Sequence, residues 1–249
     1  MARMYIALLG DVHGNLPALE AVLADADARR CQALWNIGDF VGYGPFPDAC
    51  VRLLAERADA SIIGNYDQKA LKFPRKRKKW QKFKRREKWL AFRFAFERLS
   101  EESRRFLEGL PEQRRLEAEG HRVLLCHGSP ADVSEHIEAE TAEPRMRELA
   151  ALADADIVVS GHTHQPLVRE AAGVTFVNTG TVGRPDDGDP RACYAVLELT
   201  PDGPRVEHHR VPYDVERTVA AVREVGLPRA FAEMFRQGRR LDDVSPPER

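Results

Sequence analysis

Five apolar runs in this 249-residue sequence each end where a glycine stands beside a polar side chain of a type that binds cations. The five endings are Gly10-Asp11-Val12-His13, Gly38-Asp39, Gly64-Asn65, His127-Gly128 and Gly161-His162-Thr163-His164. Helical patterns separate the first three runs, so residues 4–63 predict the order strand, helix, strand, helix, strand. This alternation predicts an α/β fold in which at least some strands are parallel.

The second half of the sequence resumes this alternation and then loses it. It predicts five more strands, at residues 123–126, 157–160, 174–178, 193–199 and 206–211. A helix at residues 143–153 separates the first two of these strands, whereas no helix separates the last three, and an amphipathic helix follows at 214–225. We therefore expect a second, more antiparallel sheet. A chain of this length suits one core, which predicts a single domain over residues 1–249.

The polar side chains at the five strand ends are expected to converge, because ligand sites in open α/β sheets form beyond the carboxyl ends of the strands. They are two carboxylates, four imidazoles and one amide: Asp11, His13, Asp39, Asn65, His127, His162 and His164. Burying these groups together is costly unless they surround a cation. Their number exceeds the four ligands of one tetrahedral ion and suits two neighbouring ions with a bridging carboxylate, for which we choose Asp39. Imidazole and oxygen ligands without thiolates favour Mn, Fe, Zn, Ni or Co over Mg or Ca.

Residues 69–93 carry 13 Lys or Arg side chains and one acidic residue, Glu87. The segment therefore has a charge of +12, against −13 for the rest of the chain. Aromatic side chains interleave with these charges, which predicts a basic helical insertion or lid at residues 69–110 rather than a disordered tail. The charge indicates either contact with an anionic substrate, a nucleic acid or an acidic partner, or a solvated amphipathic face.

Other features of the composition narrow the class of protein. The four cysteines are widely spaced, so neither a disulfide framework nor a zinc ribbon is indicated. No apolar run approaches the roughly 18 residues of a membrane-spanning helix, and residues 4–9 are shorter than a signal-peptide core. We therefore expect a cytoplasmic protein without membrane contact. We also expect a peripheral tail at residues 229–249, and we leave the oligomeric state open.

Together the five endings resemble the motifs of the calcineurin-like metallophosphoesterase superfamily, specifically its small prokaryotic phosphodiesterase-like members. The motifs occupy residues 10–15, 38–45, 64–67, 127–130 and 161–164. The resemblance covers roughly residues 4–200 and implies a four-layer αββα sandwich of two mixed β-sheets flanked by helices. By motif, it assigns Asp11, His13, Asp39 and His164 to one ion, and Asp39, Asn65, His127 and His162 to the other.

The resemblance further implies a hydrolase in which a metal-bridging hydroxide attacks the phosphorus of a phosphodiester, a phosphomonoester or a nucleotide. The candidate catalytic residues are Asp39, Asn65, Tyr66 and Asp67. Tyr66 departs from the family pattern, in which a histidine at this position protonates the leaving group. A tyrosine with an ordinary pKa of about 10 reloads poorly near neutral pH. We therefore expect aryl esters or anhydrides to react better than alkyl esters, with Asp67 orienting Tyr66.

Two other functions stay open. Tyr66 favours a catalytically weak scaffold, like the retromer scaffold subunit that resembles this superfamily, although a scaffold does not need the full ligand set. The basic segment favours a nuclease or a nucleic-acid-binding member of the fold, whose binding would weaken as salt rises. Arg184, in the loop after the last ligands, is assigned either to phosphate or to the surface. Four histidines lie outside the motifs and receive no role: His121, His136, His208 and His209.

Overall fold

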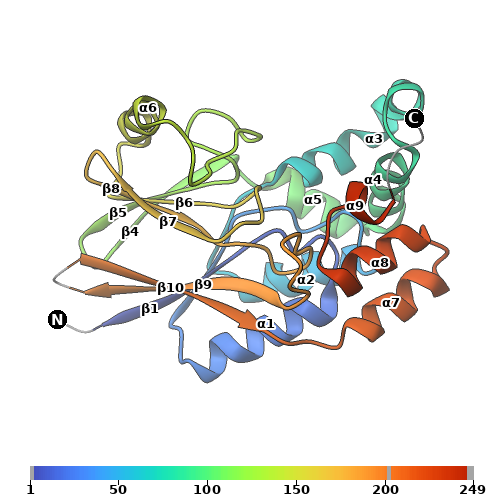
Figure 1. Cartoon of the computed structure of the whole chain (residues 1–249), viewed down its shortest axis with the longest axis horizontal. Coiled ribbons are helices and arrows are strands. Elements are labelled where there is room, and N and C mark those ends of the chain that lie inside the picture. The colour runs from blue at the N-terminus through green and yellow to red at the C-terminus, as the bar shows by residue number, and fades with distance from the viewer. Residues whose placement is uncertain (1–2, 201–202, 246–249) are drawn as a thin grey trace.

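Two five-stranded sheets lie face to face with helices on their outer surfaces (Figure 1). The structure is a computed structural model that describes residues 3–200 and 203–245. The α/β class and the four-layer αββα sandwich of two mixed sheets are therefore confirmed. Within the described residues, no helix is both long enough and apolar enough to cross a membrane.

The first sheet has the strand order β10-β9-β1-β2-β3. Its strands are β1 (Met4–Leu9), β2 (Ala33–Asn36), β3 (Ala60–Ser61), β9 (Ala192–Thr200) and β10 (Gly203–Val211). β1, β2 and β3 are parallel, as the alternation of strands and helices predicts, and β9 and β10 complete the sheet as an antiparallel pair. The register pairs Ile6 of β1 with Ala33 of β2 and Leu197 of β9.

The second sheet has the order β4-β5-β6-β8-β7. Its strands are β4 (Gln113–Ala118), β5 (His121–Cys126), β6 (Ile157–Ser160), β7 (Leu167–Ala171) and β8 (Val174–Asn178). The three central strands are parallel, and an antiparallel hairpin closes each edge. The sequence pattern misses β4 and β7, because these edge strands are partly exposed and contain no apolar run.

The helices occupy the two outer layers and one end of the sandwich. They are α1 (Leu16–Ala28), α2 (Pro47–Arg57), α3 (Asn65–Phe83), α4 (Arg86–Arg98), α5 (Glu101–Gly109), α6 (Glu143–Ala153), α7 (Val215–Glu224), α8 (Arg229–Gln237) and α9 (Leu241–Val244). Side chains of α1, α2 and α5 pack on the first sheet, and α6 covers the second. Figure 1 shows the N-terminus at one end of the sandwich, with α3, α4, α8 and α9 gathered at the opposite end.

The central strands are buried on both faces, which explains their continuous apolar runs. In β1, Ile6 and Leu8 join the core between the two sheets, whereas Ala7 and Leu9 face the helices outside the first sheet. Side chains alternate in this way because successive residues of a strand point to opposite faces. The sandwich therefore holds the carboxyl ends of its parallel strands in fixed positions.

The basic segment forms two packed helices, α3 and α4. Several of their aromatic side chains pack between the helices and against the domain: the ring centroids of Phe73 and Trp89 lie 5.4 Å apart, and Phe92 is buried. Helix α3 begins at Asn65, one of the candidate ligands, so the basic segment starts at the site itself. Whether residues 69–110 act as an insertion that closes over the site stays a prediction.

Helix α8 corrects the expectation of a peripheral tail at residues 229–249. Phe231 and Phe235 are fully buried in a cluster with Tyr43 and side chains of α7. The apolar side chains of α8 recur at helical spacing and form one face, which the sequence analysis did not use. Residues 246–249 lie outside the described part of the chain.

Candidate metal centre

All seven candidate ligands lie just beyond the carboxyl ends of β1, β2, β3, β5 and β6. Asp11, His13 and His164 form one group whose ligand atoms are close enough to hold an ion. Asp11 Oδ1 lies 3.3 Å from His164 Nε2 and 3.6 Å from His13 Nε2, and the two Nε2 atoms are 3.1 Å apart. The fold therefore brings together residues separated by more than half of the sequence.

A second group of the same kind contains Asp11, Asp39 and His127. Asp39 Oδ2 lies 3.5 Å from His127 Nε2 and 3.7 Å from His13 Nε2, so this carboxylate reaches both groups. Asn65 and His162 lie beside the second group, with Asn65 Nδ2 3.0 Å from His162 Nδ1. The ring of His162 is also 5.2 Å from that of His127.

Most of these residues have an unusual backbone conformation. Five of the seven have a positive φ angle: Asp11 (52°), His13 (50°), Asp39 (54°), His162 (66°) and His164 (64°). Residues other than glycine rarely adopt this left-handed backbone conformation. Backbone strain of this kind is found most often at functional sites. The surrounding packing must therefore hold the loops in place, as Gly64 illustrates: a Cβ there would lie 2.1 Å from Asp39 Oδ1.

The arrangement of polar atoms fits a cation. His127 Nδ1 lies 2.8 Å from the Ile37 carbonyl oxygen, and His164 Nδ1 lies 2.8 Å from the carbonyl oxygen of Arg184. These carbonyls accept N–H bonds, which leaves the Nε2 lone pairs facing the carboxylates, as is usual for metal-binding histidines. Four buried atoms of the candidate ligands also have no hydrogen-bond partner within the described residues, namely Asp11 Oδ1, His13 Nδ1, Asn65 Oδ1 and His127 Nε2.

The ionisation of the cluster supports the same conclusion. Burial raises the pKa of the Asp11 carboxyl, but His164 and His13 outweigh burial and hold that pKa well below its ordinary value. Burial lowers the pKa of His127, but the Asp39 carboxylate beside it raises that pKa to about 9. Burial, together with His127, lowers the pKa of His162 to about 4. The carboxylates therefore stay ionised, and a divalent cation can take the place of the proton on His127.

Asp67 holds the loop backbone around this cluster. Its carboxylate accepts hydrogen bonds from the backbone N–H groups of Asp39 (2.9 Å), Val41 (3.1 Å) and Gly64 (3.0 Å). Burial and the Asp39 carboxylate raise the pKa of Asp67 to about 8, while the N–H groups of Gly64 and Val41 oppose that shift. The expectation that Asp67 orients Tyr66 is corrected, since the hydroxyl of Tyr66 pairs instead with that of Tyr43 at 2.7 Å.

A cavity of about 320 Å³ opens beside the candidate ligands. Tyr66 and Arg184, which the sequence singles out, line it together with Tyr43, which the sequence pattern did not single out. His136, which received no role, also lines it, and its ring lies 4.9 Å from the His162 ring. The guanidinium of Arg184 lies over the Tyr43 ring, 4.8 Å from its centroid. Tyr43 stands four residues after the ligand Asp39 in the same glycine-rich loop, which was an available signal.

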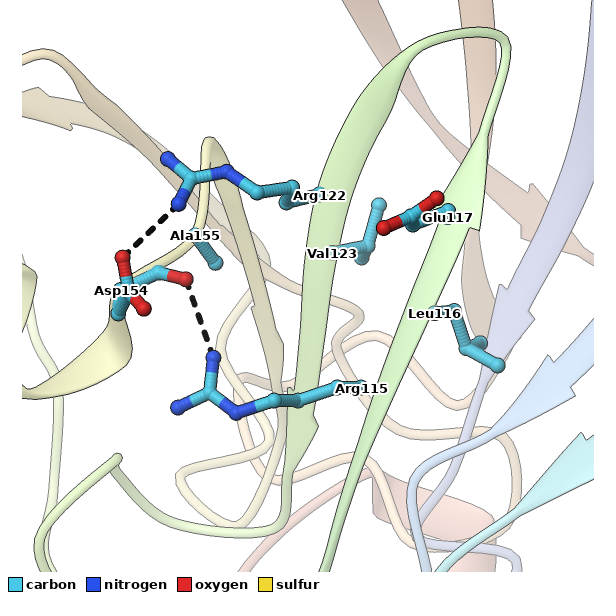
Figure 2. Close-up of a pocket in the computed structure, with 7 residues that line it drawn as sticks. All are labelled: Arg115, Leu116, Glu117, Arg122, Val123, Asp154 and Ala155. Carbon is cyan, nitrogen blue, oxygen red and sulfur yellow. Dashed lines mark hydrogen bonds and ion pairs between the residues drawn. The ribbon is translucent and has the colours of Figure 1, made fainter.

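A second hollow, of about 250 Å³, lies between the β4–β5 hairpin and the turn after α6 (Figure 2). Its two arginines already have partners, because Arg122 donates to the Asp154 carboxylate and Arg115 donates to the Asp154 carbonyl. It is formed at the amino ends of β5 and β6, opposite the strand ends that carry the ligands. This hollow therefore has no part in the candidate metal centre.

Comparisons with known proteins agree with this geometry. The family model described as the calcineurin-like phosphoesterase superfamily domain matches residues 4–202. The crystal structure of a metallophosphoesterase from Sphaerobacter thermophilus has 34% sequence identity and a TM-score of 0.78, and the match covers 95% of this chain and 100% of that one.

Curated relatives include an uncharacterized protein of Methanocaldococcus jannaschii, 26% identical over 96% of this chain and 100% of its own length. Phosphodiesterase YfcE of Escherichia coli is 26% identical over 78% of this chain and 88% of its own length. The clustered Asp and His side chains provide places where a metal ion could be held, as this metal-dependent family requires. The chain belongs to the calcineurin-like phosphoesterase superfamily and is a metal-dependent phosphoric ester hydrolase.

Proposed function

We propose that this hydrolase is dinuclear, with two divalent transition-metal ions held by the seven strand-end residues and Asp39 between them. One observation carries the proposal: Asp39 Oδ2 lies 3.7 Å from His13 Nε2 of one group and 3.5 Å from His127 Nε2 of the other. A carboxylate in this position suits two neighbouring ions. The ions are drawn from Mn, Fe, Ni, Zn and Co, because the ligand set combines imidazoles and oxygens without thiolates.

The residues of the site have separate roles in hydrolysis. When bound, the two ions supply a water of lowered pKa and positive charge for the phosphate oxygens. Asp39 and Asp11 balance that charge, and Asn65 offers its unpaired amide oxygen. The Tyr66 hydroxyl lines the cavity and is placed to donate to the ester oxygen that leaves when the P–O bond breaks. Asp67 acts through the backbone of the loops, as a positioning residue.

The substrate is a phosphodiester, a phosphomonoester or a nucleotide. The E. coli relative is named a phosphodiesterase, so a diester is among the substrates to be tested. Tyr66 in place of the family's histidine favours esters whose leaving group needs little proton donation. We therefore expect aryl esters and anhydrides to be better substrates than alkyl esters.

The test is hydrolysis of p-nitrophenyl phosphate and bis-p-nitrophenyl phosphate by metal-stripped protein, with Mn, Ni, Zn or Mg added back. Turnover that requires a transition metal and disappears in Asp39→Ala supports the proposal. Metal binding without turnover on any ester would instead support a catalytically weak scaffold. The ratio of the two rates ranks monoester against diester.

A second candidate function is binding of a nucleic acid or an acidic partner through helices α3 and α4. Residues 75–79 are all exposed basic side chains, and none has a carboxylate partner within the described residues. Phe83, at the end of α3, is 79% exposed and can stack on a base. Uncompensated charge along a helix of this kind fits a phosphate backbone.

This second function predicts salt-dependent binding of labelled single-stranded RNA or DNA by the Asp39→Ala protein, which cannot cleave it. Charge reversal of Lys76, Lys78 and Lys79 should weaken binding and flatten its salt dependence. Reversal of Arg105 and Arg147, on other helices, is the control. Binding that is unaffected by the lysine changes would exclude this surface.

A further inference from the structure

Arg184 stands in the cavity as a cation that has no carboxylate partner among the described residues. Its Nε is buried and lacks a hydrogen-bond partner, and no carboxylate pairs with its guanidinium within residues 3–200 and 203–245. The guanidinium rests on the ring of Tyr43, whose hydroxyl pairs with that of Tyr66 at 2.7 Å. Two phenol hydroxyls and a guanidinium therefore line one side of the cavity.

Leaving this guanidinium unpaired is unfavourable. A guanidinium carries five N–H donors, and a buried donor without a partner costs free energy. Asp186 lines the same cavity, where its Oδ2 accepts from Arg240 at 3.0 Å; its Oδ1 is buried without a hydrogen-bond partner among the described residues, so neither carboxylate oxygen pairs with Arg184. A ligand that brings its own oxygen atoms into the cavity would satisfy the donors that the protein leaves open.

The backbone fixes where that ligand must lie. The carbonyl oxygen of Arg184 accepts from His164 Nδ1 at 2.8 Å, which ties Arg184 to a candidate metal ligand. Its side chain shares the cavity lining with Asp39 and Tyr66. An anion held by Arg184 therefore sits directly beside the metal centre, where the phosphoryl group of the substrate belongs.

The number of non-bridging phosphoryl oxygens decides which class of substrate Arg184 binds more tightly. A phosphodiester has two non-bridging oxygens and one negative charge, and two metal ions can take both oxygens. A phosphomonoester dianion has a third non-bridging oxygen and a second charge, which need a further donor. Guanidinium groups bind such oxygens with strong, charge-assisted hydrogen bonds.

We propose that Arg184 binds the third non-bridging oxygen of a phosphomonoester, so that the site favours phosphomonoesters over phosphodiesters. The inference rests on the proposed dinuclear hydrolase and names its substrate class. Arg184 keeps its proton throughout, and water still adds across the P–O bond.

The test compares wild type with Arg184→Gln on p-nitrophenyl phosphate and bis-p-nitrophenyl phosphate, with metal content measured for both proteins. We expect kcat/KM for the monoester to fall by on the order of tenfold to a hundredfold, the worth of a charge-assisted hydrogen bond. The diester should change by less than about threefold, because it has no third non-bridging oxygen for Arg184 to bind. A purely structural role would lower both rates together, and that result would overturn the proposal.

Two variants make the outcome specific. Arg184→Lys keeps the charge without the planar fork and should fall between wild type and Arg184→Gln in its monoester-to-diester ratio. If Arg184→Gln fails to fold, Arg184→Lys tests the same proposal. Arg217→Gln removes a cation that lies outside the cavity lining and is paired with Glu20, and should leave the ratio unchanged. A ratio that shifts equally in Arg217→Gln would contradict a specific role for Arg184.

A binding measurement separates this inference from the proposed function. Inorganic phosphate should raise the thermal unfolding temperature of metal-loaded wild type more than that of Arg184→Gln. If wild type hydrolyses neither ester with any metal, the proposed function fails, whatever the phosphate result. If wild type hydrolyses both esters but phosphate protects the two proteins equally, only the role of Arg184 is overturned.

Discussion

The loops of the metal centre depend on one buried carboxylate, and its removal should cost much of the stability of the protein. Asp67 accepts hydrogen bonds from three buried backbone N–H groups, those of Asp39, Val41 and Gly64. In Asp67→Ala these donors lose the only acceptor that they have among the described residues, and each buried donor left unsatisfied costs about 1 to 3 kcal/mol. We therefore expect the free energy of unfolding to fall by about 3 to 9 kcal/mol, out of a typical total of about 5 to 15 kcal/mol.

Urea unfolding of the metal-free protein, followed by circular dichroism, measures this loss. Asp67→Asn is the matched control, because its amide oxygen can still accept from the N–H groups of Asp39 and Gly64, which share one carboxylate oxygen. We expect it to lose about half as much stability as Asp67→Ala. A loss below about 1 kcal/mol in Asp67→Ala would refute the reasoning, since a single neutral hydrogen bond is worth that much.

Three further perturbations have definite expected results. Tyr66→His should raise hydrolysis of an alkyl phosphate relative to p-nitrophenyl phosphate, and an unchanged ratio of the two kcat/KM values would argue against Tyr66 as the donor to the leaving group. Burial raises the pKa of Asp48, but hydrogen bonds from Ser100 outweigh burial and lower it. Its stabilising contribution is therefore present above the unfolded-state pKa of about 3.9 and is lost as pH falls through the folded-state value. The difference in urea midpoint between wild type and Asp48→Asn should accordingly shrink in acid, and a constant difference from pH 7 to pH 2.5 would contradict the linkage. Phe231→Ala should cost about 3 to 5 kcal/mol in the same unfolding assay because its side chain is fully buried, whereas a peripheral tail would lose under about 1 kcal/mol.

The central strands and the ligands at their ends were predictable from the sequence, because the apolar runs mark the strands and the topology fixes where those strands end. The central strands are buried on both faces, so that they stand out as apolar runs, and parallel strands bring their carboxyl ends to one edge. Asp11 and His164 could therefore be placed together in advance although 153 positions separate them. Convergence followed from topology, without knowledge of any contact.

The features that sequence reasoning missed depend on three-dimensional context. The strands β4 and β7 are edge strands with exposed side chains, which leaves them without an apolar signal. The hydrogen bonds of Asp67 to the loop backbone depend on how the loops turn in space. The residues next to Asp67 in the sequence do not indicate that geometry. For Arg184 the sequence left phosphate contact and a surface role open, because a single arginine in a loop carries no pattern, and the structure places it in the cavity lining, with its carbonyl oxygen bonded to His164.

The most direct test of the central claim is the number of metal ions bound per chain. Metal-stripped wild type and Asp39→Ala would be dialysed against excess manganese, and the bound metal would be measured by elemental analysis together with the protein concentration. We expect two ions per wild-type chain and fewer than two in Asp39→Ala, because Asp39 Oδ2 stands between both groups of ligands. One ion or none in wild type, or equal metal content in the two proteins, would contradict a dinuclear centre bridged by Asp39.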